Sequence, residues 1–151
     1  MAADKTVIIS VPETDDENSP MLELTVRRVT EVKISEELDS DIIKTFDEPV
    51  SVPSSDGGFT VDISALEARN IDEFKTLKKI LLRMKKKAGN ITVKENIKHK
   101  TGNFDDINYL SGVTLTSNEV TYDAEDLTAR DLSFNAETNS EVVDGEEIKL
   151  D

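Results

Sequence analysis

The stretch that most constrains the fold is residues 70–89, NIDEFKTLKKILLRMKKKAG, which carries the chain's one long helix signal. Asn70 is a good N-cap, because its side chain can accept a hydrogen bond from the first helical turn. Lys85, Lys86 and Lys87 place positive charge at the other end, where the helix dipole favours it. Gly89 suits the left-handed residue just past a helix C-terminus. We therefore predict a helix over about residues 71–87.

The two sides of this predicted helix differ in chemistry when residues are placed about 100° apart. The apolar side holds Phe74, Leu77, Ile80, Leu81 and Met84. The basic side holds Lys75, Lys79, Arg83 and Lys86. Such a helix lies on a surface with its apolar stripe covered. We predict that the stripe packs on a sheet of its own subunit and that the basic side is a candidate interface with an acidic surface of another copy.

The charge of the chain is unevenly distributed. The net charge is −14, with 32 acidic against 18 basic residues. Residues 71–100 hold ten bases and three acids, a charge of +7, so the rest of the chain carries −21. Such a separation permits attraction between opposite faces of neighbouring copies. The alternative is a solvated basic helix on an acidic protein.

The sequence lacks the residue constellations of an enzyme. It has no cysteine and a single histidine, His99, so thiolate chemistry is excluded and a zinc site is implausible. No phosphate-binding glycine motif and no nucleophile elbow occur. The acidic clusters at 105–106 and 123–126 lack the spacing of a calcium loop. We therefore expect no catalytic residues, no metal and no cofactor.

Nucleic-acid binding and membrane insertion are also disfavoured. No aromatic residue is interleaved with the helix lysines to stack on bases, and the pI is about 4.5. Residues 1–20 contain no apolar stretch long enough for a signal peptide or a membrane span. We expect neither specific DNA binding nor a membrane partner.

The first half of the chain reads as strands with several open alternatives. Thr6–Val11 is an edge strand or an arm that pairs elsewhere. Leu22 to Ile34 alternates as one strand with a bulge near Arg27 and Arg28. Ser35–Phe46 is a short helix, or a loop from which a strand starts at Asp41 and runs to Val52; the second is favoured. Pro49 and Pro53 then indicate an edge strand or a break in it. Residues 54–58 are a strong turn, which predicts a hairpin whose second strand holds Phe59, Val61 and Ile63 and leads into the helix.

The second half continues with strands. Ile91, Val93, Ile97 and His99 keep a period of two. Residues 100–106 form a predicted loop, and residues 113–122 form one or two strands. Asp123–Asp126 is a turn, and Leu132 with Phe134 marks the last clear strand. Strands, one helix and then strands indicate an α+β fold: an antiparallel β-sandwich or small barrel with one flanking helix.

The order of these segments resembles tail tube proteins of tailed bacteriophages. A hairpin ending in GFTVDIS leads into the flanking helix. There follow ITVKENIKHKTG, then INYLSGVTLTSNEVTYDAED, and a final LTARDLSFNAET. The family shares near its C-terminus a strand, a short turn and a strand ending in an apolar-x-Phe pattern. Here the corresponding stretch consists of Gly112–Ser117, then Val120–Tyr122, and then Leu132-Ser133-Phe134. The resemblance covers roughly residues 55–137.

The resemblance implies a structural virion protein. Such a protein assembles into hexameric rings that stack into a hollow tail tube, through which DNA passes without specific binding. It implies contacts with other copies and with tail proteins such as tape measure, sheath or baseplate. It places the protein in the virion tail, assembled in the host cytoplasm. An excess of acidic residues suits a lumen that must not bind DNA, because like charges repel.

We expect a single domain over residues 1–151. Within it, residues 1–20 are an N-terminal arm and acidic loop, 21–134 the β-core with its helix, and 135–151 an acidic C-terminal segment. The alternative function is a monomeric β-sandwich adaptor, a binding module whose basic helix docks on an acidic partner.

Overall fold

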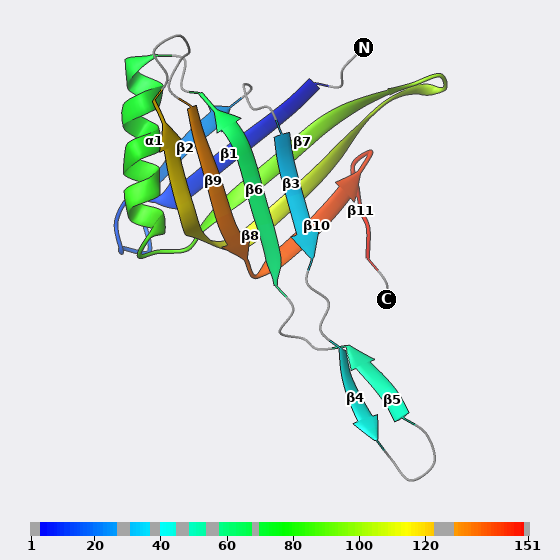
Figure 1. The fold of residues 1–151 in the computed structure, drawn as a ribbon. Helices are drawn as coiled ribbons and strands as arrows, with labels where there is room; N and C mark the ends of the chain where they lie inside the picture. The colour runs from blue at the N-terminus through cyan, green and yellow to red at the C-terminus, as the bar shows by residue number, and fades with distance from the viewer. Residues whose placement is uncertain are drawn as a thin grey trace.

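The computed structural model describes residues 4–26, 31–36, 40–44, 49–53, 58–67, 70–122 and 129–149. These residues form mostly antiparallel β-structure with a single helix (Figure 1), as the α+β prediction requires. The elements are β1 (Asp4–Pro12), β2 (Met21–Val26), β3 (Glu31–Glu36), β4 (Ser40–Lys44), β5 (Pro49–Pro53), β6 (Phe59–Leu66), α1 (Ile71–Met84), β7 (Gly89–His99), β8 (Gly102–Thr121), β9 (Ala129–Ala136), β10 (Thr138–Val143) and β11 (Glu146–Glu147).

One long strand, β8, links two halves of the main sheet. The strand order is β2-β1-β7-β8-β9-β6-β3, with β10 paired to β8 and β11 to β10. The first half of β8 pairs with β7 and β10, and its second half, from Thr114, pairs with β9. At the ends of this order β2 and β3 each have one partner among the described strands. The described strands therefore do not close into the barrel that was one of the two predicted forms.

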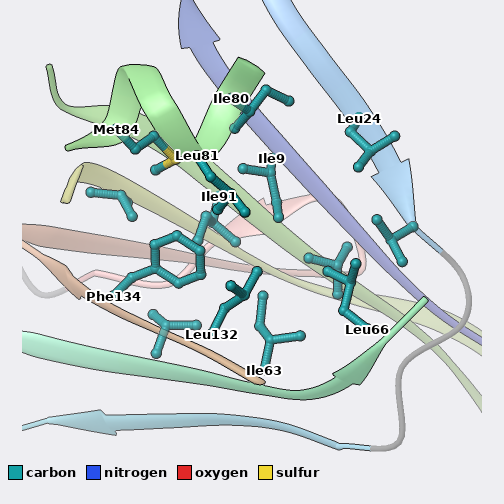
Figure 2. Packing of buried hydrophobic residues seen from close by; sticks show 14 of the residues in the cluster. Ile9, Leu24, Ile63, Leu66, Ile80, Leu81, Met84, Ile91, Leu132 and Phe134 are labelled. Carbon is teal, nitrogen blue, oxygen red and sulfur yellow. The ribbon is translucent and has the colours of Figure 1, made fainter. Parts of the chain in front are cut away.

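The buried core joins both halves of the sheet to the helix. Ile63 of β6 and Phe134 of β9 meet Ile9 of β1, Ile91 of β7 and Leu81 of α1 in one apolar cluster (Figure 2). Each of these side chains is at most 3% exposed. Burying such a side chain is worth roughly 1.5–3 kcal/mol, so this cluster fixes the helix on the sheet.

The first strand is more central than the sequence predicted. An edge strand or an arm pairing elsewhere was expected at Thr6–Val11. In the structure β1 lies between β2 and β7 and pairs with both. Val7, Ile9 and Val11 are all completely buried, which explains why the strand belongs inside the sheet. A short run of residues that favour β-structure predicts a strand, but it does not distinguish an edge strand from an inner one.

The predicted continuous strand from Leu22 to Ile34 is wrong. Its two parts are β2 and β3, which lie at opposite ends of the strand order. The bulge proposed at Arg27 and Arg28 falls outside the described residues. Both parts alternate with the same period, and each buries its apolar side against the common core. The alternation of apolar residues therefore could not show that β2 and β3 lie in different halves of the main sheet.

The predicted hairpin across residues 54–58 is also not formed. The first strand of that hairpin, β5, pairs with β4 in a separate two-stranded sheet. The second, β6, pairs with β3 and β9 instead. The favoured strand from Asp41 to Val52 is divided into β4 and β5, and the second of these begins at Pro49, one of the two prolines that indicated an edge or a break. The turn at 54–57 lies outside the described residues.

Strands of the second half follow the prediction more closely. The period-two segment at Ile91–His99 lies in β7, and Leu132 and Phe134 lie in β9. The predicted loop at 100–106 is shorter, because β8 already begins at Gly102. Polar residues of β7 and β8 pair across the hairpin that these two strands form. Asn96 Nδ2 of β7 donates a hydrogen bond to Asp105 Oδ1 of β8 at 2.9 Å. The predicted turn at Asp123–Asp126 is outside the described residues.

Gly89 has a different role from the one predicted. The helix ends at Met84 with Lys85 as its C-cap, so it is shorter than residues 71–87. Gly89 instead opens β7, where a Cβ atom would lie 2.3 Å from the backbone oxygen of Ser10. A glycine is needed there because β1 approaches β7 too closely for any side chain.

Replacing Gly89 with alanine should lower the free energy of unfolding by about 1–3 kcal/mol, the usual cost of overpacking. Chemical denaturation measures the change. Gly58→Ala is the matched control, since its Cβ would meet the Ala136 backbone oxygen at an ordinary 3.4 Å. Equal stability of Gly89→Ala and the parent would contradict the close approach.

Candidate interaction surface

The helix is held in one orientation by its cap and its apolar stripe. The side-chain oxygen of Asn70 accepts a hydrogen bond from the Glu73 backbone N–H at 2.9 Å, as the N-cap prediction requires. The residues facing the sheet are Leu77, Ile80, Leu81 and Met84, each at most 3% exposed. The helix packs mainly on β1, β2 and β8. Its opposite side therefore faces outward.

The outward side of α1 combines lysines with exposed apolar side chains. Three of the four predicted interface residues are exposed: Lys75 and Lys79 on α1, and Lys86 two residues past its end. On the same helix Ile71 is 72% exposed and Leu82 62% exposed. A docking surface needs both apolar area and charge, and this side supplies both. We call Ile71, Lys75, Lys79, Leu82 and Lys86 the basic face.

Phe74 lies at the margin of the apolar stripe rather than inside it. Its side chain is 36% exposed, whereas the sequence predicted a buried residue. Lys78 Nζ lies 4.8 Å from its ring centroid and the Arg130 guanidinium carbon 5.7 Å. Arg130 is 7% exposed and donates from Nη1 to Asn118 Oδ1 at 3.3 Å. No local pattern predicted this buried arginine, because its neighbours come from distant segments.

Arg83, the fourth predicted interface residue, is engaged within its own subunit. Its Nε donates to the Pro12 carbonyl at 3.1 Å, and Nη2 donates to Asp15 Oδ1 at 3.0 Å. Lys87 Nζ lies 3.9 Å from the same carboxylate oxygen. These contacts attach the acidic loop between β1 and β2 to the end of α1. Arg83 therefore stabilises the contact between this loop and α1 within its own subunit. The residues of the basic face are the ones left to contact another molecule.

The Arg83 hydrogen bond, together with the charges of Arg83 and Lys87, holds the pKa of the Asp15 carboxyl below its ordinary value of 3.8. A carboxyl with a lowered pKa in the folded state contributes stability above its unfolded pKa. That contribution is lost as the pH falls through the folded pKa. The contact between the loop and the helix is thus present at neutral pH and lost in acid.

Replacing Arg83 with glutamine should raise the pKa of Asp15 toward 3.8, because the main cation beside it is removed. NMR titration of the Asp15 side-chain carboxyl carbon measures the change. Lys86→Gln is the control, since Lys86 contributes least to the lowering and its loss should raise the pKa less. A parent Asp15 that titrates at its ordinary value would contradict the contact.

An acidic surface lies on the flank opposite α1. Residues 137–147, here called the acidic hairpin, comprise β10, β11 and their turn (Figure 1). They contain five exposed acids and no base: Glu137, Glu141, Asp144, Glu146 and Glu147. The basic face and the acidic hairpin thus lie on opposite sides of the molecule.

The described residues contain no group of three or more His, Cys, Asp or Glu side chains suited to a metal ion. His99, the one histidine, is exposed at the end of β7, where Nδ1 lies 3.0 Å from Thr101 Oγ1. Within the described part of the chain, no helix has the length and apolar character needed to cross a membrane.

Comparison with solved structures identifies the fold. The chain is similar to a protein in the six-fold symmetrised baseplate of the anti-feeding prophage, with 8% identity and a TM-score of 0.53 over 94% of this chain and 95% of the other. It is also similar to an Hcp protein, with 11% identity and a TM-score of 0.51 over 97% of this chain and 96% of the other. The chain has the fold of these two proteins over nearly its whole length.

A weaker likeness is to a chain of the PVC sheath–tube complex, an extracellular contractile injection system in its extended state. It has 12% identity and a TM-score of 0.49 over 91% of this chain and 87% of the other. No model of a protein family matches the chain, and no characterised protein matches it by sequence.

Proposed function

We propose that the chain is a self-assembling structural subunit of a phage-tail-like apparatus. In this proposal six copies form a ring, and the rings stack into a hollow tube through which DNA passes without specific binding. The observation that carries it is the shared fold with an anti-feeding prophage baseplate protein over almost the entire chain. That assembly is described as six-fold symmetrised, which supports a ring of six.

The charge distribution supports a head-to-tail arrangement of copies. The basic face lies on one flank and the acidic hairpin on the other, so one copy presents to the next a surface of opposite sign. Contacts between two different surfaces close into rings or continue as filaments. Electrostatic complementarity of this kind sets the orientation of the partners. In this proposal the two halves of the main sheet act as a β-sandwich that keeps both flanks apart.

The proposal includes further partners of the assembled apparatus. The basic face lies on a helix that stands at the outside of the subunit, where other tail proteins such as sheath, baseplate or tape measure have access. In this proposal the subunit is not an enzyme, and it resides in the virion tail after assembly in the host cytoplasm.

Light scattering coupled to size-exclusion chromatography tests self-association. We expect a species six times the subunit mass of 16.8 kDa, about 101 kDa, or larger stacks of it. Raising the salt concentration should shift the population toward smaller species, because salt screens contacts between exposed charges. A 16.8 kDa species at every protein and salt concentration would contradict the proposal. That result would favour the monomeric adaptor. The exposed apolar side chains of Ile71 and Leu82 on the basic face would then be the surface that docks on the partner.

A further inference from the structure

A polar cavity opens at the end of the core away from α1. It lies between β3 and β6 on one side and β8 and β10 on the other, and its volume is about 410 Å³. The helix fills the other end of the core with apolar side chains, but here the lining is mixed. The lining residues are Ile34, Glu36, Phe59, Asn108, Asn139 and Glu141.

The cavity offers hydrogen-bond acceptors that the subunit leaves unused. Asn139 donates from Nδ2 to Asn108 Oδ1 at 3.1 Å. The Oδ1 atom of Asn139 is shielded from solvent and has no hydrogen-bond partner among the described residues. A buried acceptor without a donor costs about 1–3 kcal/mol. In the described part of the chain neither Glu36 nor Glu141 forms an ion pair. Among the residues that the structure describes, the site therefore lacks a cationic hydrogen-bond donor.

The two kinds of lining match the two parts of a lysine side chain. Ile34 and Phe59 give an apolar wall for the methylene stem, which lysine readily buries. The ammonium group has three donors and no acceptor, which suits the exposed carboxylates of Glu36 and Glu141. The phenyl ring adds a face that attracts a cation.

The end of the β7–β8 hairpin, residues 97–103, carries lysines beyond the body of the subunit (Figure 1). The pairing of β1 with β7 stops at Asn96, and that of β10 with β8 stops at Asp106. Residues 97–99 therefore pair only with residues 102–104 of the same hairpin. Lys98 and Lys100 are both exposed, and the segment holds no acid. We call residues 97–103 the hairpin tip.

We propose that the hairpin tip of one copy inserts Lys98 or Lys100 into the polar cavity of a second copy. A lysine at the end of a protruding hairpin can extend its side chain into a cavity of another copy. The lysines of the basic face are less suited to this, because their helix packs flat along the sheet. The contact joins two different surfaces, so it propagates from copy to copy. It rests on the proposed self-assembly and adds a second contact to that of the basic face.

Charge-reversal variants test the contact. The double variant Lys98→Glu with Lys100→Glu should weaken self-association by about tenfold or more, because a cation is lost from a site that holds two carboxylates. Both residues lie outside the core, so the fold should persist. Glu36→Lys with Glu141→Lys should weaken association similarly, and all four changes together should restore it. The control Lys5→Glu with Lys33→Glu makes the same change in net charge at exposed sites elsewhere.

Carbodiimide cross-linking identifies the partners directly. An assembly made from equal parts of ¹⁴N- and ¹⁵N-labelled protein should give peptides of mixed label that join Lys98 or Lys100 to Glu36 or Glu141. An assembled parent with no such cross-link, or a tip variant that associates as well as the parent, would overturn the contact alone. A parent that never assembles would overturn the proposed function, and this contact with it.

Discussion

Replacing Leu81 with alanine should lower the free energy of unfolding by about 2–5 kcal/mol. Leu81 is 3% exposed and lies in the cluster that joins α1 to both halves of the sheet (Figure 2). Truncation removes buried apolar surface and leaves a cavity that the surrounding strands cannot easily fill. Urea denaturation followed by circular dichroism measures the loss.

Leu82→Ala is the matched control for this change, because it removes the same atoms from the next residue of the same helix. Leu82 is 62% exposed, so the free energy of unfolding should change by less than about 0.5 kcal/mol. Similar losses in the two variants would show that α1 does not face the sheet as the structure has it.

Replacing Lys75, Lys79 and Lys86 together with glutamate should leave the subunit folded and impair its assembly. The three side chains are exposed on the basic face, so the core is not disturbed. Exposed ion pairs contribute about 0–1 kcal/mol each, so the three together are worth at most roughly 3 kcal/mol per contact. Repetition around a ring multiplies this effect. Sedimentation velocity at low salt measures the assembled fraction.

Arg83 is left unchanged in this variant because it holds the acidic loop through Pro12 and Asp15. The control replaces Lys5, Lys33 and Lys94 with glutamate, which changes the net charge equally at exposed sites away from the helix and from the acidic hairpin. Only the basic-face variant should lose assembly. If both assemble like the parent, the basic face is merely solvated.

The helix and the later strands were readable from the sequence because their signals are local. A cap at Asn70 and a repeat of apolar residues every three to four positions define α1. Simple alternation defines β7 and β9. The sidedness of α1 followed from the same periodicity, and only Phe74, at the margin of the stripe, was misplaced.

The pairing of strands was not readable, because alternation shows which side is buried and not which strand lies beside it. The sequence therefore joined β2 to β3, which lie at opposite ends of the strand order, and β5 to β6, which do not pair. The Arg83–Asp15 contact joins residues 68 positions apart, so no local pattern could reveal it. The polar cavity likewise needs residues from four strands.

Electron microscopy of the purified protein tests the central claim most directly, since it shows whether copies form an ordered assembly. The account predicts six-fold rings with a central hole, and stacks of such rings at low salt and high protein concentration. A field of separate particles of subunit size under every condition would contradict it.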